Sequence, residues 1–347
     1  MFKKLKVKEV KRETNDAVSV VFDVSSELKD EFKYQSGQYV TLKKDIGGED
    51  VRRAYSLSSS PQEDDYRIGV KKIDGGKMSS FLNDNLSVGD ELEVMPPKGN
   101  FLLTNKSAHS VGFAAGSGIT PIISMVKTVL QADGTFTLFY VNKTSNEVIF
   151  KSELDNLKES YPDHFNLKYI YTREDVGDPI LSGRIDKDKC NNLMKANMEL
   201  LKADGFYMCG PEEMIINVSD ALKELGVDKE KIHFELFTAS VNKEENSVIS
   251  DFLGESQVRV IMDGEEFDFE LSGEGDSILD AAIENGADAP FSCKGAVCCT
   301  CKAKVIEGKA IMEMNYSLSD DEVEEGYILT CQAHPASEKL VVDYDVT

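Results

Sequence analysis

Hydrophobic and polar residues alternate along the first hundred residues, which is the period of β-strands. The alternation runs through residues 18–23, and the short segments YVTL, YRIGV and ELEVM continue it between Gly, Asp, Asn and Pro residues. Short strands at this spacing predict a small antiparallel β-barrel over residues 1–104, with one helix near Met78–Asn85.

After residue 105 the pattern changes to apolar strands that alternate with helical segments. Strands are expected at 110–116, 135–142, 165–172 and 206–210, and helices at 120–131, 150–160 and 211–226. This order predicts a doubly wound parallel sheet over residues 105–238. Such sheets bind ligands at the carboxyl ends of their strands.

A polar stretch at 239–255 has no sustained period and is expected to be a linker. Beyond it, residues 256–347 are expected to form a third domain, which begins with two strands joined at Asp263-Gly264, a typical hairpin turn. A helix over 277–286 follows, with Ser277 as its N-cap and Gly286 at its end. The pattern therefore predicts a multidomain protein that combines α/β and all-β domains.

Composition narrows the class of protein. The 347 residues are 41% hydrophobic and 29% charged, which is typical of globular chains, and the formal net charge is −23. Residues 256–347 alone hold 20 acidic and 6 basic side chains. Because nucleic acids and anionic membranes attract basic surfaces, neither is an expected partner. The N-terminus lacks the apolar stretch of a signal peptide and no apolar run reaches about 20 residues, so a cytoplasmic location is expected.

Five of the seven cysteines fall within the last domain, and their spacing is typical of a metal centre. Cys293, Cys298, Cys301 and Cys331 follow the pattern C-x4-C-x2-C with a distant fourth cysteine, which is the spacing of plant-type [2Fe–2S] sites. The alternative is a structural zinc site, which usually has two C-x2-C pairs, and here only one is present. Cys299 lies between two of these ligands and is interpreted as a bystander, although a ligand exchange with its neighbours stays open.

Two loops of the central domain have the composition of phosphate-binding turns. Gly116, Gly118 and Thr120 lie where a strand gives way to a helix, so that the glycines allow a tight turn and Thr120 could cap the helix. Because the third glycine of G-x-G-x-x-G is absent, an ordinary strand-to-helix turn is the alternative. A second loop, Cys209-Gly210-Pro211, follows a later strand at the same expected edge of the sheet, which favours a dinucleotide site.

A third strand end at this edge carries Thr172 and Arg173. A guanidinium beside a hydroxyl suits a monoester phosphate, because Arg binds it through two parallel hydrogen bonds. This favours NADPH over NADH, whose free ribose hydroxyl usually meets an acidic residue. A solvated loop arginine is the alternative.

The barrel carries two more candidate segments. Arg53, Tyr55 and Ser56 alternate along a strand in the segment RAYS, where Tyr55 could also be a core residue. The segment GGKMSS places glycines before a short helix whose N-terminus could hold a phosphate.

Taken together, the segments RAYS, GSGITP and CGP resemble the ferredoxin-NADP reductase superfamily, with a plant-type ferredoxin domain fused at the C-terminus. Longer stretches are similar to the reductase subunits of phenylacetyl-CoA epoxidases, namely AAGSGITP, YMCGPEEM, SILDAAIENGADAPFSCKGAVCCTCK and YSLSDDEVEEGYILTCQA. The resemblance covers nearly the whole chain. It implies an FAD-binding barrel, an NAD(P)-binding domain and a β-grasp ferredoxin domain at the ranges given above.

The resemblance also implies roles for the barrel residues. Arg53 would bind a flavin phosphate, Tyr55 would pack on the isoalloxazine, and Ser56 would form a hydrogen bond near its reactive nitrogen, with Ala54 between them. The pyrophosphate of FAD would be held by the segment that opens the short helix, which consists of Gly76, Lys77, Met78 and Ser79.

In the central domain, Thr120 and Cys209 would flank the nicotinamide, which makes Ser56 and Cys209 the candidate catalytic residues. Phe237 would lie near the other face of the flavin. The resembled family member has Arg at the position of Lys143, so a phosphate-binding role for that position is weakened.

The implied function is electron transfer from NADPH through FAD to a [2Fe–2S] cluster and on to an oxygenase. FAD is needed between the other two because hydride carries two electrons and the cluster accepts one. In the resembled system the oxygenase is the diiron phenylacetyl-CoA epoxidase. One alternative is the reductase of a Rieske or other multicomponent oxygenase, with FMN as a possible flavin. Another is a redox-sensing module that binds flavin and cluster without turnover.

Overall fold

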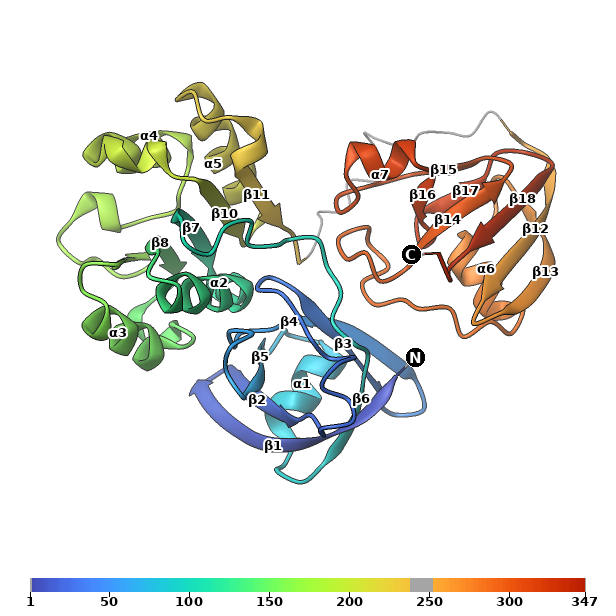
Figure 1. The fold of residues 1–347 in the computed structure, drawn as a ribbon, viewed down its shortest axis with the longest axis horizontal. Helices are drawn as coiled ribbons and strands as arrows, with labels where there is room; N and C mark the ends of the chain where they lie inside the picture. Colours follow the sequence, from blue (N-terminus) through green and yellow to red (C-terminus); the bar gives the residue numbers. More distant parts are fainter. Residues whose placement is uncertain (1, 238–251, 347) are drawn as a thin grey trace. The chain divides into compact units, whose positions relative to one another are not determined.

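The computed structural model describes residues 2–237 and 252–346 (Figure 1). The chain divides into two compact units, Met1–Phe237 and Thr238–Thr347. The expected fold class is confirmed, because the first unit contains an antiparallel and a parallel sheet and the second holds a mixed sheet with the helices α6 (Ile278–Glu284) and α7 (Asp320–Glu324) packed on its strands. Most of the expected linker at 239–255 lies outside the described residues.

The barrel is a six-stranded antiparallel sheet with the order β4-β3-β6-β1-β2-β5. Its elements are β1 (Lys3–Thr14), β2 (Ala17–Asp23), β3 (Tyr39–Asp45), β4 (Asp50–Ser56), β5 (Tyr66–Lys71), β6 (Glu91–Val94) and the helix α1 (Lys77–Asp84). The core forms because alternate residues of the strands point inward, as Leu5, Val7, Val18 and Val20 do. The helix α1 closes the barrel by burying Met78 and Leu82 in this core.

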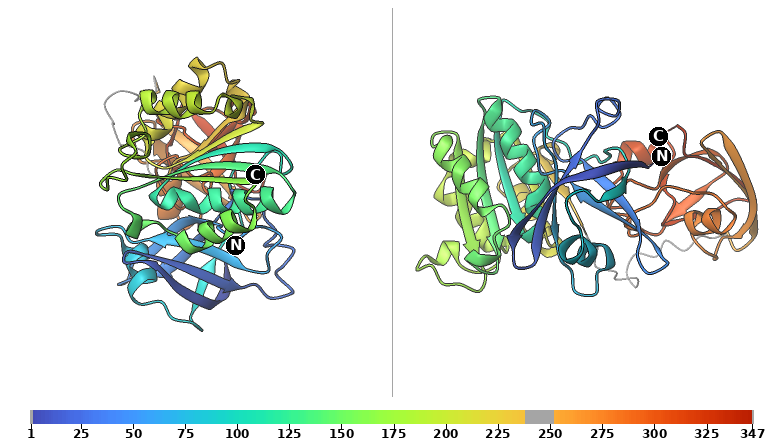
Figure 2. Two further views of the ribbon diagram at one scale, coloured as in Figure 1. Left: turned by 90° about the vertical axis from the view of Figure 1, so that its left-hand side faces the viewer. Right: turned by 90° about the horizontal axis from the view of Figure 1, so that it is seen from below.

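The central domain is a five-stranded parallel sheet with the order β11-β10-β7-β8-β9. Its strands are β7 (His109–Ala115), β8 (Thr135–Asn142), β9 (Phe165–Tyr171), β10 (Gly205–Cys209) and β11 (Ile232–Glu235), and its helices are α2 (Ile119–Gln131), α3 (Lys151–Ser160), α4 (Lys187–Ala196) and α5 (Glu212–Glu224). The helices α2 and α3 cover one face of the sheet and α4 and α5 the other (Figures 1 and 2). Strands and helices lie within two residues of the expected ranges, but the pattern did not predict α4 or β11.

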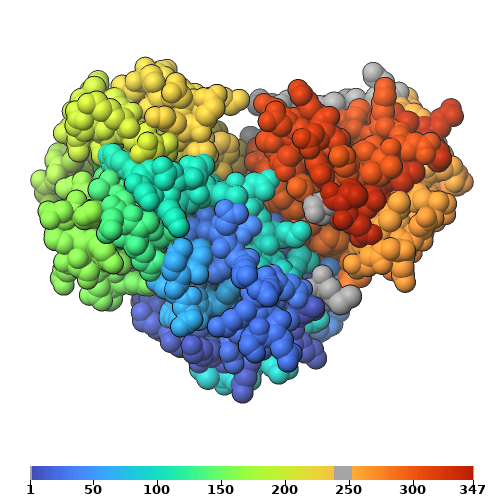
Figure 3. Space-filling view, in the orientation of Figure 1, coloured from blue at the N-terminus to red at the C-terminus, as the bar shows by residue number. Residues whose placement is uncertain are grey.

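The barrel and the central domain belong to the same compact unit, and their surfaces adjoin (Figure 3). Two barrel glycines make this close packing possible. A Cβ on Gly69 would lie 2.7 Å from Thr120 Cγ2, and a Cβ on Gly37 would lie 2.7 Å from the Met125 side chain. Since Thr120 and Met125 both belong to α2, this helix is one of the parts of the central domain that meet the barrel.

The second unit is a mixed sheet with the order β13-β12-β18-β14-β16 and a separate pair, β15-β17. Its elements are β12 (Glu255–Met262), β13 (Glu265–Ser272), β14 (Lys302–Glu307), β15 (Ala310–Met312), β16 (Tyr327–Leu329), β17 (Ala333–Pro335), β18 (Lys339–Asp343), α6 (Ile278–Glu284) and α7 (Asp320–Glu324). The expected hairpin is confirmed by positive φ at Asp263 and Gly264, and the Ser277 side chain accepts a hydrogen bond from the N–H of Asp280, as a cap does.

Among the helices of residues 2–237 and 252–346, none combines the length and the apolar composition needed to cross a membrane.

Candidate functional site

The two glycine-containing loops of the central domain press against each other at the carboxyl edge of the sheet. A Cβ on Gly118 would lie 2.0 Å from the carbonyl oxygen of Cys209, and a Cβ on Gly210 would lie 2.9 Å from the Ala115 Cβ. Any larger residue at either position would force the loops apart. Gly116 has a φ of +54°, and a Cβ there would meet nothing within 4 Å, so the outer side of this loop is open to a ligand.

Thr120 does not cap α2, contrary to the sequence expectation. The N-cap residue is Gly118, and Thr120 is the second residue of the helix. Its hydroxyl donates to the Ser117 carbonyl over 3.0 Å. Thr120 is 2% exposed, and the edge of β5 packs on it at Gly69. Its place beside the barrel is therefore fixed by packing.

Ser56, Cys209 and Glu235 meet where the barrel touches the parallel sheet. The Ser56 hydroxyl, at the end of β4, donates to Glu235 Oε2 over 3.3 Å. Glu235 is paired in register with Cys209 on the neighbouring parallel strand. The structure thus brings the two candidate catalytic residues to one carboxyl group that the sequence analysis did not single out.

The carboxyl group of Glu235 is held in an environment that favours its neutral form. Burial raises its pKa to about 8, opposed by the hydrogen bond from Ser56. Burial, together with the negative charge of Glu235, also raises the pKa of the Cys209 thiol. At neutral pH this site therefore holds two protonated groups, which can donate hydrogen bonds or a proton to a bound ring.

Thr172 and Arg173 follow β9 at the same edge of the sheet. Their N–H groups donate to the carbonyls of Asn142 and Lys143 over 2.9 Å, which continues the sheet past the end of β8. The Arg173 side chain is exposed, and no carboxylate among the described residues pairs with it. The neighbouring Glu174 turns away and accepts from the N–H of Ser145 over 2.7 Å.

In the barrel, Arg52 and Arg53 have different environments. Arg52 is buried and binds the carboxylate of Asp50, whereas Arg53 is exposed and, among the described residues, its side chain donates to the Arg52 carbonyl alone, over 2.6 Å. Arg53 is thus free to bind an anion from outside the chain. Tyr55 is partly buried on the same side of β4, and burial raises the pKa of its hydroxyl. Ala54 between them is partly exposed.

The N-terminus of α1 is an open donor site. Its cap residue is Gly76, which has no side chain to bind the N–H groups of the first turn, and a Cβ on the preceding Gly75 would meet nothing within 4 Å. Lys77 is exposed and forms an ion pair with Glu49. These features fit a pyrophosphate, because helix N-termini attract anions.

The side chains of two residues in this segment, Met78 and Ser79, stabilise the barrel itself. Met78 is 1% exposed and belongs to the barrel core, so any contact with a cofactor can involve only its backbone. The hydroxyl of Ser79 accepts from the N–H of Ile73 over 3.1 Å and stabilises the turn.

The cysteine loop of the second unit folds around its own sulfur atoms. The N–H of Gly295 donates to Cys293 Sγ over 3.3 Å, and the N–H of Cys293 donates to Cys298 Sγ over 3.4 Å. Lys294 and Ala296 adopt positive φ, which turns successive N–H groups inward. Such donors stabilise anionic sulfur, so the loop fits a negatively charged iron–sulfur cluster.

The four thiols lie as two pairs. A hydrogen bond from Cys298 lowers the pKa of Cys293 to about 6, and one from Cys301 lowers the pKa of Cys331. In the described part of the chain, no three or more His, Cys, Asp or Glu side chains lie close enough together to bind one metal ion. Two pairs of thiolates are nevertheless the donor set that two irons need. The buried Ser292 hydroxyl beside Cys293 has no hydrogen-bond partner in the described residues, which also fits a group still to be bound there.

The remaining cysteines have structural surroundings. Cys299 Sγ donates to the Ser317 carbonyl over 3.2 Å. Cys190 is fully buried in α4, and burial raises its pKa to about 12. Phe237 is 37% exposed and is the last described residue before the gap.

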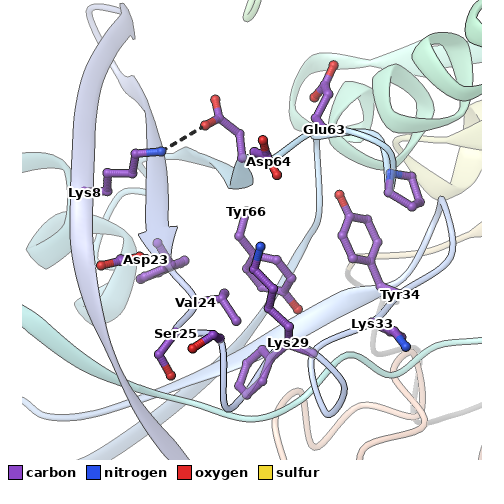
Figure 4. A pocket seen from close by; sticks show the side chains of 15 residues that line it. Lys8, Asp23, Val24, Ser25, Lys29, Lys33, Tyr34, Glu63, Asp64 and Tyr66 are labelled. Atoms are coloured by element: carbon purple, nitrogen blue, oxygen red, sulfur yellow. Dashed lines mark ion pairs between the residues drawn. The ribbon is translucent and has the colours of Figure 1, made fainter.

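A cavity of about 740 Å³ lies elsewhere on the barrel (Figure 4). Tyr34 and Tyr66 line it with their rings at 86° to each other, and Lys8 forms an ion pair with Asp65 at its rim. The hydroxyl of Tyr66 has no hydrogen-bond partner within the described ranges. None of the predicted site residues lines this cavity, so it is separate from the site around Ser56.

Family models match almost the whole of the two units. An oxidoreductase FAD-binding domain matches residues 4–102, an oxidoreductase NAD-binding domain matches residues 113–220, and a 2Fe-2S iron-sulfur cluster binding domain matches residues 260–336.

The chain is similar over its whole length to components of multicomponent oxygenases. It is 39% identical to a component of the 1,2-phenylacetyl-CoA epoxidase from Escherichia coli (strain K12), covering 99% of this chain and 98% of that protein. It is 36% identical to the ferredoxin reductase component of 3-ketosteroid-9-alpha-monooxygenase from Rhodococcus rhodochrous, covering 98% and 96%. Among solved structures, phthalate dioxygenase reductase matches with a TM-score of 0.63 and 25% identity, covering 99% of this chain and 98% of that one.

The raised pKa of Glu235 makes stability depend on pH. Its folded-state pKa of about 8 lies above the ordinary value of 4.5, so the protonated carboxyl favours the folded state below about 4.5, and this contribution is lost as pH rises through 8. Urea unfolding between pH 5 and 8.5 should therefore show wild type losing stability relative to Glu235→Gln. The exposed Glu230→Gln variant should follow wild type. If the difference in free energy of unfolding between wild type and Glu235→Gln did not change with pH, the raised pKa of Glu235 would be contradicted.

Proposed function

Because the chain belongs to the FAD- and NAD-binding oxidoreductases that carry a [2Fe–2S] domain and serve oxygenases as reductase components, we propose that it passes electrons from NADPH through FAD to the cluster and then to an oxygenase. When bound, NADPH supplies two electrons as hydride, FAD separates them, and the cluster accepts one at a time. The observation that carries the proposal is the meeting of Ser56, Cys209 and Glu235 between the two cofactor-binding domains of the first unit.

The chain's own residues provide binding and orientation. In this proposal the Arg53 guanidinium and the N–H groups of Lys77, Met78 and Ser79 bind the phosphates of FAD, with Gly76 allowing their close approach, and Tyr55 lies against the flavin ring. Thr120, Gly116 and the Cys209–Pro211 loop hold the nicotinamide half of the dinucleotide, and Phe237 covers the flavin.

At the reacting edge, Ser56 and the protonated Glu235 hold a hydrogen-bond network next to the buried Cys209 thiol. Since Cys209 is 0% exposed, water has little access to this point when a ring covers it. In the second unit, Cys293, Cys298, Cys301 and Cys331 bind the cluster as thiolates, and the N–H groups of Gly295 and Cys293 compensate its charge.

The residues that follow β9, Thr172 and Arg173, favour NADPH as the coenzyme. The exposed Arg173 has no carboxylate partner within the described residues, and Thr172 places a hydroxyl beside it. Lys143 at the neighbouring strand end is not used in this proposal, because its ammonium group lies 3.8 Å from Glu147 Oε2. A 2′-phosphate would satisfy Arg173, whereas the free hydroxyl of NADH would leave it unused.

The electron acceptor we propose is the diiron oxygenase of a phenylacetyl-CoA epoxidase, which is the system named for the 39% identical relative. The alternative acceptor is another multicomponent oxygenase, as in the 3-ketosteroid and phthalate systems. A redox sensor without turnover is the remaining alternative, and steady oxidation of NADPH with a one-electron dye would exclude it.

Reconstitution identifies the acceptor. Purified protein mixed with the oxygenase components of the epoxidase should support NADPH-dependent oxidation of phenylacetyl-CoA. The rate of product formation should be at least about tenfold above the rate of product formation that the same protein supports with a Rieske oxygenase and the substrate of that oxygenase. A tenfold preference corresponds to about 1.4 kcal/mol. Equal rates with both oxygenases, or a higher rate with the Rieske enzyme, would reject the epoxidase as the specific partner.

Replacing a cluster ligand should separate the two halves of the electron path. In Cys298→Ser the cluster should be lost, so reduction of a ferredoxin-type acceptor should stop while NADPH still reduces the flavin. The neighbouring Cys299→Ser is the matched control, because Cys299 donates to the Ser317 carbonyl and is not part of the C-x4-C-x2-C pattern. Iron content and absorbance measure the cluster, and acceptor reduction at the wild-type rate by Cys298→Ser would disprove the path.

Arg173→Ala should raise the KM for NADPH by about 10- to 100-fold, since a charged hydrogen-bonded contact is worth about 1.5–3 kcal/mol. The KM for NADH should change little. Arg184→Ala is the control, because Arg184 is exposed and pairs with Glu213 on the protein surface. An equal rise for both coenzymes would remove the phosphate-binding role of Arg173.

A further inference from the structure

Helix α2 carries a buried polar stripe on the face that meets the barrel. Ser124, Lys127 and Thr128 are spaced i, i+3 and i+4, so they lie on one face of the helix. Their exposed fractions are 0%, 4% and 6%. Buried positions at this period are usually apolar, so three polar side chains here need a reason.

The stripe binds the loop that directly follows β4. Ser124 Oγ donates to the Ser59 carbonyl over 2.6 Å, and Lys127 Nζ donates to the Ser58 carbonyl over 3.2 Å. Thr128 Oγ1 donates to the Ser60 hydroxyl over 3.3 Å. Three consecutive residues of the barrel, 58–60, are therefore tied to three residues of the helix.

Lys127 also joins acidic groups from both domains. Its ammonium group lies 3.3 Å from Glu63 Oε2 in the barrel and forms a second ion pair with Glu153 on α3. A buried charge has a strict geometric requirement, because losing either partner leaves it uncompensated in a poorly hydrated place. A contact between apolar surfaces would tolerate a small movement of one domain along the other. These hydrogen bonds and ion pairs, in contrast, are made together at one relative position of the barrel and α2.

The stripe connects the two halves of the reacting site. The loop at 58–60 begins two residues after Ser56, and α2 begins at Ile119, directly after the glycine loop that presses on Cys209. Any shift of α2 along the barrel would therefore change the distance from Ser56 to Cys209 and Glu235.

We propose that the polar stripe sets the alignment of the barrel and the nucleotide-binding domain for hydride transfer, with Lys127 as its main positioning residue. The proposal rests on the proposed function, since it concerns the geometry of that same reaction. Lys127 is not one of the predicted cofactor contacts, and it acts through the position of Ser56 and Cys209.

Lys127→Met tests the proposal, because it keeps an unbranched side chain of similar length and removes the charge. At saturating NADPH the rate of flavin reduction should fall by about 10- to 100-fold, as expected for a reacting pair moved by about 1 Å. The dissociation constant for NADPH and the flavin content should stay within about twofold of wild type. Lys187→Met is the matched control, because Lys187 forms an exposed ion pair with Glu224.

A second readout follows the alignment itself. The chain contains no tryptophan, so Met198→Trp, at a position 55% exposed on the nucleotide-binding domain, reports the distance to the flavin through energy transfer. Adding Lys127→Met should change the transfer efficiency, and adding Lys187→Met should not. If Lys127→Met folds poorly, Glu63→Gln removes one ion pair near the surface and should change both readouts in the same direction.

Unchanged flavin reduction and unchanged energy transfer in both Lys127→Met and Glu63→Gln would overturn the proposal. A slower reduction without any change in energy transfer would also overturn it, because Lys127 would then act by another route. If wild type does not oxidise NADPH, the proposed function fails, while the energy-transfer comparison still decides whether the stripe sets the alignment.

Discussion

The close approach of two loops at the edge of the parallel sheet is the constraint on which the rest of the first unit depends. Gly118 lies so near the Cys209 carbonyl that no side chain fits between them. This contact fixes where α2 begins, and the length of α2 then fixes where its polar stripe meets the barrel. The end of β4 is held there, so Ser56 reaches Glu235. The meeting of Ser56, Cys209 and Glu235 between the two domains thus depends on backbone packing as much as on polar contacts.

The second unit has its own hydrophobic core, and its fold provides a place for anionic sulfur atoms. A cluster needs anionic sulfur held away from water, and burying several thiolates without compensation is costly. The loop from Cys293 to Cys301 turns through Lys294 and Ala296 in left-handed conformations, which direct N–H groups to the sulfurs. Buried donors of this kind tune the charge and reduction potential of a cluster. The fused arrangement gives each module a fold suited to one electron-transfer step.

Much of this architecture could be predicted from the sequence, because strand and helix periods are local. The cysteine spacing likewise predicted a cluster domain, which the family match at 260–336 supports. What the sequence did not reveal depends on register between distant strands. Glu235 was missed because only the pairing of β10 with β11 brings it beside Cys209. Thr120 was wrongly expected to cap α2, because the helix starts one residue earlier than its composition suggested. The sequence predicted the helix at 120–131 but not the role of Ser124, Lys127 and Thr128, because only the packing of the barrel on this helix buries them.

The most direct test of the electron path is anaerobic mixing of the intact holoprotein with excess NADPH, followed by absorbance and by electron paramagnetic resonance of rapidly frozen samples. We expect flavin absorbance to fall first and the signal of the reduced cluster then to grow at a rate limited by the flavin. A cluster that stays oxidised after the flavin is fully reduced, or one that is reduced before the flavin, would contradict this electron path.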